Sequence, residues 1–207
     1  MSRQLGFYFN ADICIGCKAC QIACKDKNHL PMGVLWRRVV NYGGGSWVQS
    51  GDIMIPQNVF GYFLSISCNH CEDAPCLHNC PTGAISKNED GIVLIDDDVC
   101  IGCRYCSWVC PYGAPQFNED DGVMTKCNFC YDLQAEGKNP ACVDACPLRA
   151  IEFGEIEELR AKHGDVVEIE PLPKREITSP ALVIHPHRHA QATGQGTGHI
   201  LDMEGEI

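Results

Sequence analysis

The arrangement of cysteines constrains this chain more than any other feature of its sequence. All sixteen cysteines fall into four groups of four, and none lies outside a group. The groups are Cys14, Cys17, Cys20 and Cys24; Cys68, Cys71, Cys76 and Cys80; Cys100, Cys103, Cys106 and Cys110; and Cys127, Cys130, Cys142 and Cys146. The 45% of residues that are hydrophobic includes these cysteines, so the remaining apolar content is low for a globular domain. We therefore expect that groups bound by the cysteines organise much of the fold.

Two kinds of cysteine group alternate along the chain. The first and third groups have the same spacing, and residues 13–17 match residues 99–103 almost letter for letter. The second and fourth groups both begin with Cys-Asn-x-Cys and end with Cys-Pro, which an Ala-Ile pair closely follows. The order A, B, A′, B′ indicates a duplicated unit.

Three kinds of chemistry use cysteines in such numbers. Disulfides suit small secreted domains, and cysteines two residues apart in overlapping runs are poor disulfide partners. Zinc needs two pairs separated by a longer loop, which only the fourth group provides. A C-x₂-C-x₂-C run reaches three corners of a [4Fe–4S] cubane, and in two-cluster ferredoxins the fourth Cys, followed by Pro, binds the other cluster. We predict four [4Fe–4S] clusters, with zinc and disulfides as the alternatives; Lys25 after Cys24 departs from the Cys-Pro pattern.

The exchange of fourth ligands predicts which cysteines share a cluster. Groups two and three are joined by residues 84–96, which are predicted to form a β-hairpin with its turn at 88–91 and its second strand at 92–95. These two groups would form one two-cluster unit, and groups one and four pair by elimination. The predicted ligand sets are Cys68, Cys71, Cys76 and Cys110; Cys80, Cys100, Cys103 and Cys106; Cys14, Cys17, Cys20 and Cys146; and Cys24, Cys127, Cys130 and Cys142.

This pairing predicts an α+β fold of two interleaved ferredoxin-like two-cluster modules, with long loops and an extended C-terminal tail. One module would consist of residues 1–30 and 112–160, and the other of residues 58–111. Residues 31–57 would be a β insertion, and residues 161–207 the tail. The two ends of the chain would thus fold together around the middle module.

The segments outside the cysteine groups give weaker predictions. Residues 34–42 and 58–67 are predicted to be strands. The three glycines at 43–45 are predicted to form a turn rather than a phosphate loop, because no Lys-Ser/Thr pair follows them. Residues 156–163 are predicted to form a short helix, with acidic residues at its start and basic residues at its end.

The last part of the chain, from Glu170 onward, is rich in Pro, His, Gly and Thr and has little periodicity. We expect it to lie extended on a partner subunit, with disorder as the alternative. His185, His187 and His189 alternate and would share one face of a strand. An exposed or interface run of histidines is favoured there over a metal site.

Charge and hydropathy argue against several functions. The net charge of −11 disfavours nucleic-acid binding, which depends on Lys and Arg. No apolar run approaches the roughly 18 residues of a membrane span, and we expect no signal peptide, because no apolar segment opens the sequence. Arg37-Arg38 is internal and is followed by no apolar stretch, so it does not suit a twin-arginine signal. We find no nucleophile–base set, Rossmann glycine motif or paired carboxylates, so the chain is not expected to be an enzyme on its own.

Several stretches carry a resemblance to a known family. They are residues 65–72 (SISCNHCE), 99–106 (VCIGCRYC), 110–116 (CPYGAPQ) and 146–150 (CPLRA), together with the four-group order. In these features the chain resembles the iron–sulfur electron-transfer subunit (the B subunit) of dimethyl sulfoxide reductase and other molybdopterin oxidoreductases. The resemblance covers nearly the whole sequence, and every ligand position of the four groups is Cys.

This resemblance implies a subunit that relays electrons in anaerobic respiration. Its partners would be a membrane subunit that oxidises quinol and a catalytic subunit that carries molybdopterin. The implied substrate is dimethyl sulfoxide or another S-oxide or N-oxide, with polysulfide, thiosulfate or selenate as alternatives. The implied location is peripheral on the membrane, on its outer face, by co-export with the catalytic subunit. A zinc-organised adaptor without redox function and a soluble polyferredoxin remain the competing hypotheses.

Overall fold

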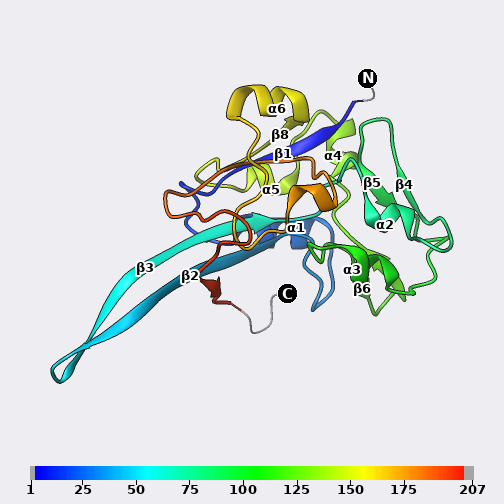
Figure 1. Cartoon of the computed structure of the whole chain (residues 1–207). Helices are drawn as coiled ribbons and strands as arrows, with labels where there is room; N and C mark the ends of the chain where they lie inside the picture. Colours follow the sequence, from blue (N-terminus) through cyan, green and yellow to red (C-terminus); the bar gives the residue numbers. More distant parts are fainter. Residues whose placement is uncertain (1–2, 203–207) are drawn as a thin grey trace.

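Two antiparallel strand pairs of the same design flank the cysteine loops. The structure is a computed structural model that describes residues 3–202. In it β4 (Ile85–Lys87) pairs with β5 (Val93–Ile95), which confirms the hairpin predicted between the second and third cysteine groups. β8 (Ile151–Glu155) pairs in the same way with β1 (Leu5–Asn10). In both pairs, a strand that follows a Cys-Pro turn lies beside a strand that precedes a cysteine group. The second pair therefore joins the N-terminal strand to the segment that follows the fourth cysteine group (Figure 1).

A second hairpin, which is not among the elements predicted from the sequence, lies between the third and fourth cysteine groups. It consists of β6 (Gln116–Asn118) and β7 (Val123–Thr125). Its turn begins with Asn-Glu-Asp, as does the turn between β4 and β5. In both turns the Asn side chain accepts a hydrogen bond from the backbone N–H two residues later, at 3.0 Å for Asn118 and 3.1 Å for Asn88. This repeated Asx turn is the signal that predicts the hairpin.

The helices are short, and most of them carry cysteines. They are α1 (Ala19–Lys27), α2 (Pro75–His78), α3 (Tyr105–Val109), α4 (Tyr131–Ala135), α5 (Ala141–Asp144), α6 (Ile156–His163) and the 3₁₀ turn η1 (Arg175–Ile177). The predicted helix at 156–163 is confirmed as α6, and Gly164 follows it with a positive φ of 89°. None of the helices within residues 3–202 is both long enough and apolar enough to cross a membrane.

A long hairpin projects from the body as an arm (Figure 1). It consists of β2 (Arg38–Ser50) and β3 (Ile53–Ile66), so the strand predicted at 34–42 begins later and runs further, and the boundary expected at residue 57 lies inside β3. The predicted turn at 43–45 is wrong, because these glycines lie within β2. Gly43 pairs with Gly61 across the ladder, and a Cβ on Gly43 would lie 2.9 Å from the Phe60 carbonyl oxygen. Glycine there permits a close approach of backbone rather than a reversal of the chain.

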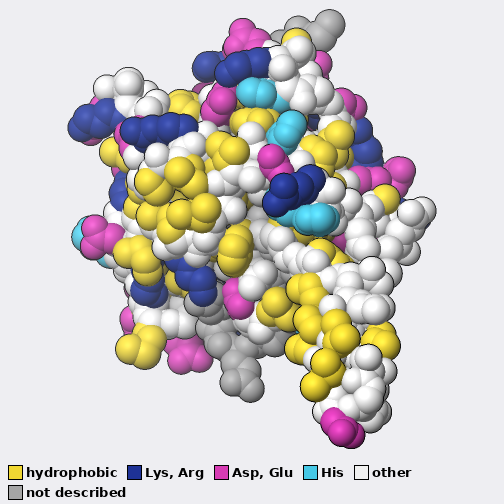
Figure 2. Space-filling view, turned by 90° about the vertical axis from the view of Figure 1, so that its left-hand side faces the viewer, with side chains coloured by type: hydrophobic (Ala, Val, Ile, Leu, Met, Phe, Trp, Pro, Cys, Tyr) yellow, Lys and Arg dark blue, Asp and Glu magenta, His cyan; other side chains and the backbone are white. Residues whose placement is uncertain are grey.

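The outer part of the arm is apolar on both faces. Trp47, Ile53 and Val59 are each more than 60% exposed, and hydrophobic side chains gather along the arm in Figure 2. Asp52, at the turn, is the only Asp, Glu, Lys or Arg in residues 39–71. The arm thus lacks the charged residues that usually protect exposed strands from further pairing.

Parts of the C-terminal segment pack on their own chain as strands, so the segment is not extended throughout; its contact with a partner subunit stays a prediction. β9 (Leu182–His185) runs parallel to β1 and completes a three-stranded sheet in the order β8-β1-β9. Val183 and Ile184 are almost completely buried, one on each face of this sheet. β10 (His199–Ile200) pairs with β2 at the base of the arm. The last five residues of the predicted tail, 203–207, lie outside the described residues.

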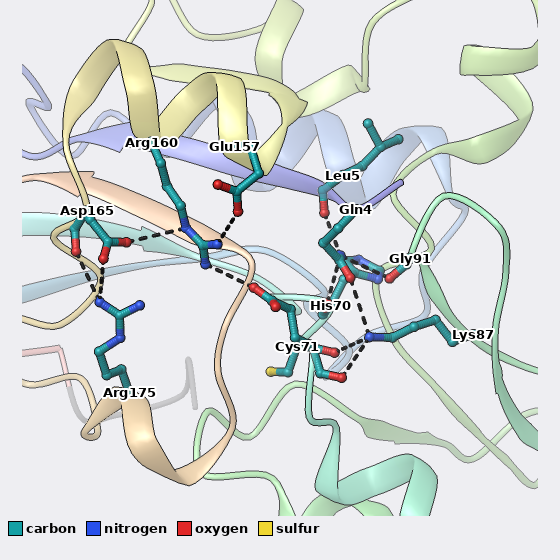
Figure 3. Close-up of polar contacts among 11 residues, drawn as sticks. Gln4, Leu5, His70, Cys71, Lys87, Gly91, Glu157, Arg160, Asp165 and Arg175 are labelled. Atoms are coloured by element: carbon teal, nitrogen blue, oxygen red, sulfur yellow. Dashed lines mark hydrogen bonds and ion pairs between the residues drawn. The ribbon is translucent and has the colours of Figure 1, made fainter. Parts of the chain in front are cut away.

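Side chains that bind backbone carbonyls hold the second cysteine loop against the N-terminal segment (Figure 3). Gln4 donates from Nε2 to the carbonyls of His70 and Gly91, both at 3.1 Å. Lys87 of β4 donates from Nζ to the carbonyl of Cys71 at 2.7 Å. These bonds join the segment at Gln4 to the loop of the second cysteine group and fix the backbone of that loop.

Arg160 of α6 holds the same loop from another side (Figure 3). Its guanidinium lies 3.0 Å from a carboxylate oxygen of Glu72, 2.7 Å from one of Glu157 and 3.3 Å from one of Asp165. Arg175 of η1 pairs with Asp165 at 2.8 Å. Through this network α6 and the C-terminal segment both support the loop that contains the second cysteine group.

Candidate metal centres

The structure gathers the cysteines into sets of four that differ from the four sequence groups. Three cavities each contain four cysteines in their walls. They are site 1 (Cys14, Cys17, Cys20 and Cys146), site 3 (Cys68, Cys71, Cys76 and Cys110) and site 4 (Cys80, Cys100, Cys103 and Cys106). Each set takes three cysteines from one sequence group and one from another. These are three of the four sets expected from the exchange of fourth ligands.

The remaining cysteines form site 2, which consists of Cys24, Cys127, Cys130 and Cys142. Burial raises the pKa of Cys24 to about 12, and the nearby thiols of Cys142 and Cys130 raise it as well. Burial also raises the pKa of Cys127 well above its ordinary value, with the thiols of Cys24 and Cys142 adding to the effect. The structure thus gathers the twelve cysteines of sites 1, 3 and 4 around three cavities, and it places the thiols of Cys24, Cys127, Cys130 and Cys142 near enough to affect one another's pKa.

Short helices explain how one cysteine of each group reaches a different site. Cys20 and Cys24 lie four residues apart in α1, so they are on the same helix face, one turn from each other. Cys20 belongs to site 1 and Cys24 to site 2. On the neighbouring helix α5 the order is reversed, because Cys142 belongs to site 2 and Cys146, just after the helix, belongs to site 1. The pair α2 and α3 distributes its cysteines between sites 3 and 4 in the same way.

Neighbouring sites are close enough for their thiols to interact. The pKa of Cys20 is raised, first by burial and then by thiols that include Cys142 of site 2. Cys127 of site 2 and Cys68 of site 3 share one small apolar cluster. Burial raises the pKa of Cys76 of site 3 to about 12, and one of the thiols that add to this is Cys106 of site 4. The thiol sets therefore follow one another in the order 1, 2, 3, 4.

The two outer sites are open to the surface and the two inner sites are not. Cys17 of site 1 and Cys103 of site 4 are exposed, whereas all four cysteines of site 2 are buried and so are three of site 3. An exposed apolar side chain lines the cavity of each exposed cysteine: Ile15, which is 62% exposed, at site 1, and Ile101, which is 67% exposed, at site 4. Large exposed apolar groups around an open site are typical of surfaces that contact another protein.

The buried charged side chains show whether these sites suit iron–sulfur clusters. Arg37, Arg38 and Lys126 are each at most 7% exposed, whereas no Asp or Glu in residues 3–202 is buried. None of the three cations pairs with a carboxylate in that part of the sequence. Burying a cation without an opposite charge costs several kcal/mol. A cubane bound by four thiolates carries net negative charge and supplies the missing counter-charge. The donor sets and their buried cations therefore fit [4Fe–4S] clusters.

Backbone N–H groups are also directed at sulfur atoms. The N–H of Ala150 donates to Cys146 Sγ at 3.2 Å, and the N–H of Met124 donates to Cys100 Sγ at 3.4 Å. Such bonds stabilise negative charge on sulfur and are among the features that set the potentials of iron–sulfur clusters. The sequence motif alone does not reveal them, because they depend on the path of the loop after each cysteine.

The histidines of the C-terminal segment do not share one strand face as expected. Only His185 belongs to β9, whereas His187 stacks on Tyr62, with ring centroids 5.6 Å apart, and lies 5.3 Å from the ring of His189. Within residues 3–202, no group of three or more His, Cys, Asp or Glu side chains could hold a single metal ion. Of the three histidines, His187 packs against Tyr62 of β3, near the base of the arm.

Comparison with known proteins identifies the family. A model of the 4Fe–4S dicluster domain matches residues 59–156. The sequence is 54% identical to the B chain of anaerobic dimethyl sulfoxide reductase from Escherichia coli over 98% of both chains. It is 50% identical to the B chain of the same reductase from Haemophilus influenzae over 96% of this sequence and 97% of that one. It is 38% identical to the B chain of polysulfide reductase from Wolinella succinogenes over 91% and 97% of the two chains.

These relatives are chains of multi-subunit reductases, and their likeness to this protein extends over nearly its whole length. The matched family model describes a 4Fe–4S dicluster domain, which agrees with the cysteine sets and the buried cations. The protein is thus a non-catalytic subunit with [4Fe–4S] clusters, and it belongs to the family of iron–sulfur B subunits of dimethyl sulfoxide reductase.

Proposed function

We propose that this protein binds four [4Fe–4S] clusters, one at each site, and relays electrons along them between two partner subunits. Each cluster supplies one-electron chemistry when it is bound. The observation that carries the proposal is the succession of four thiol sets, buried in the middle and exposed at Cys17 and Cys103 at the two ends. An adaptor or a storage site has no need for such a continuous series with two open ends.

The proposed ligands at each site are the four cysteines that define it. This assignment divides the chain into two interleaved ferredoxin-like modules, one of residues 1–30 and 112–160 and the other of residues 58–111. The similar pairing of β8 with β1 and of β4 with β5 supports this division, because each pair joins the two cysteine groups of one module. Residues 31–57 and 161–207 are additions to this frame.

The partners that we propose are a catalytic subunit that carries molybdopterin and a membrane subunit that oxidises quinol. The names of the relatives, which are chains of reductases, support a complex of this kind. One partner would contact site 1 and the other site 4, where an exposed apolar side chain lines the cavity of each exposed cysteine. We further propose that the complex works on the outer face of the membrane in anaerobic respiration, on the basis of the family resemblance.

Dimethyl sulfoxide or a related S-oxide or N-oxide is the terminal substrate that we propose for the complex. The relatives with 50% and 54% identity are named for dimethyl sulfoxide, whereas the relative named for polysulfide has 38% identity. Polysulfide is the second candidate. The substrate binds in another subunit, so the residues of this chain do not select it.

Quinol-driven turnover of the purified complex tests the relay. Cys17→Ser and Cys103→Ser change the exposed ends of the series, and each is expected to lower quinol-driven reduction of dimethyl sulfoxide at least about tenfold. Ser107→Ala is a matched control beside site 4, because Ser107 Oγ donates only to the Arg104 carbonyl, at 2.7 Å. Unchanged turnover in both cysteine variants would contradict the relay. The same assay with polysulfide decides between the two substrates.

The competing functions have different signatures. A zinc-organised adaptor would be colourless, whereas iron–sulfur clusters absorb near about 400 nm and bleach with dithionite. A soluble polyferredoxin would purify alone, whereas the proposed subunit is expected to purify with a large catalytic subunit. A chain that purifies alone and exchanges electrons freely with soluble donors would contradict the proposed complex.

A further inference from the structure

Arg37 is the most deeply buried cation of the described chain, at 2% exposure. It lies just before β2. Its Nη1 donates to Ser65 Oγ at 3.1 Å and its Nη2 to Ser67 Oγ at 2.9 Å. Its Nε is buried without a hydrogen-bond partner. The Phe7 ring lies under the guanidinium, with its centroid at 4.7 Å.

None of these neighbours carries a negative charge. Hydroxyls, a carbonyl and an aromatic face orient a guanidinium but do not neutralise it. The acidic groups near Arg37 are the thiols of sites 1 and 2. Burial alone would lower the pKa of Arg37, but the thiols of Cys142, Cys20, Cys127 and Cys24 raise it above its ordinary value.

Contacts place Arg37 beside both sites. Ser65 Oγ, which accepts a hydrogen bond from Arg37, lies 3.3 Å from Cys20 Sγ of site 1. The Phe7 ring under the guanidinium stacks on Phe129, which lies between Cys127 and Cys130 of site 2, with ring centroids 4.3 Å apart. Three of the four thiols that raise the pKa of Arg37 belong to site 2.

We propose that Arg37 is a fixed positive charge that raises the reduction potential of the cluster at site 2, and to a lesser extent that of the cluster at site 1. The inference rests on the proposed function, because it requires clusters at these sites. Arg37 is a positioning and tuning residue and binds no iron itself.

The physical reason is the charge that reduction adds. One electron passed to site 2 from a neighbouring site adds one negative charge to a buried group, and leaves the donor with one fewer. A nearby guanidinium stabilises the more negative state, and it does so strongly because the interior screens charge far less than water does. Arg37 cannot lose its proton in a protein, so its effect does not vary with pH.

The adjacent residue offers a matched control. Arg38 is also buried, but it starts β2 and its Nη2 donates to the carbonyl of Tyr112, beside site 3. Burial lowers the pKa of Arg38, and the thiol that offsets this is Cys110 of site 3. Two neighbouring arginines thus act on different sites, and their effects are separable in one experiment.

The experiment is a redox titration of the purified holo-complex followed by EPR, with the site 2 signal identified by its loss in Cys130→Ser. In Arg37→Gln we expect the equilibrium constant for reduction of site 2 to fall at least tenfold, which is about 59 mV for one electron. Arg37→Lys keeps the charge and is expected to stay closer to the wild type. Arg38→Gln is expected to shift site 3 and leave site 2 unchanged.

Each outcome bears on the inference. If wild-type protein and Arg37→Gln both contain four clusters with the same four potentials, the inference is wrong and the proposed function stands. If the wild type contains no clusters, the proposed function itself fails. If Arg37→Gln loses the site 2 cluster and Arg37→Lys restores it, the positive charge is what the site requires, as proposed. Loss that Arg37→Lys does not repair would contradict a role for the charge.

Discussion

Cys20 and Cys146 line the same cavity, although one lies in the first cysteine group and the other ends the last. Cys142, four residues before Cys146, lies in the neighbouring site instead. In a two-cluster ferredoxin this crossing ties both clusters into one folded unit. In this protein the crossing links α1, which follows β1, to α5, which precedes β8. The pairing of β1 with β8 links the same two parts of the chain a second time.

The crossing predicts the effect of serine at position 146. Oxygen is a harder ligand than thiolate, so Cys146→Ser should shift the potential of its cluster or remove an iron. We expect Cys146→Ser to change the EPR signal of site 1, which Cys14→Ser also changes. The signal of site 2, which Cys127→Ser changes, is expected to stay the same. Proximity in sequence predicts the opposite. A Cys146→Ser spectrum that alters only the Cys127→Ser signal would overturn the assignment.

Removal of iron is expected to unfold the protein. Each site joins segments far apart in the chain, and without clusters Arg37, Arg38 and Lys126 would be buried without counter-charge. Cluster binding therefore supplies a large part of the folding free energy. Near-UV circular dichroism before and after anaerobic chelation measures this. A chelated protein that keeps its native spectrum would show that the fold forms first and only then accepts clusters.

The close approach of strands in the arm predicts a difference between two paired glycines. A Cβ at Gly43 would lie 2.9 Å from the Phe60 carbonyl oxygen, whereas a Cβ at Gly61 would have no neighbour nearer than 3.8 Å. Gly43→Ala is expected to destabilise the arm by about 1–3 kcal/mol. Gly61→Ala is expected to be neutral or slightly stabilising, because alanine loses less backbone entropy than glycine on folding. The two variants can be compared by their anaerobic thermal unfolding temperatures, and equal temperatures would contradict the prediction.

The Arg160 network predicts a modest loss of stability. The Arg160 side chain is 18% exposed and joins α6 to Glu72, which lies in the loop of the second cysteine group. Arg160→Ala is expected to lower stability by about 1 kcal/mol, since exposed partners limit the value of such pairs. Lys138→Ala removes a fully exposed pair with Glu136 and is the matched control. Equal unfolding temperatures for the two variants would show that the network is not structural.

The cysteine sets were the most predictable part of the molecule. Their spacing and repetition reflect the fixed shape of the group they bind, so the sequence pattern carries the geometry. The hairpin at 85–95 and the helix at 156–163 were predictable because turn residues and terminal charges act locally. In both elements, the residues that give the sequence pattern are the same residues that form the turn or the helix end.

Long-range packing was the part that the sequence did not reveal. Gly43 was predicted to be in a turn, but its partner Gly61 and the backbone at Phe60 make glycine necessary inside a strand. β9 is a short strand between prolines, and only its position beside β1 makes Val183 and Ile184 a core. The role of Arg37 also requires the fold, since its neighbours come from distant cysteine groups.

The content of iron and acid-labile sulfide tests the central claim most directly. Anaerobically purified protein should contain about sixteen iron and about sixteen sulfide per chain, with essentially no zinc, because all four sites have four cysteines. Dithionite should bleach the protein, and the reduced form should show EPR signals from four clusters. About four zinc per chain with no bleaching would contradict the account entirely. A content near twelve iron would show that one of the four sites holds no complete cluster.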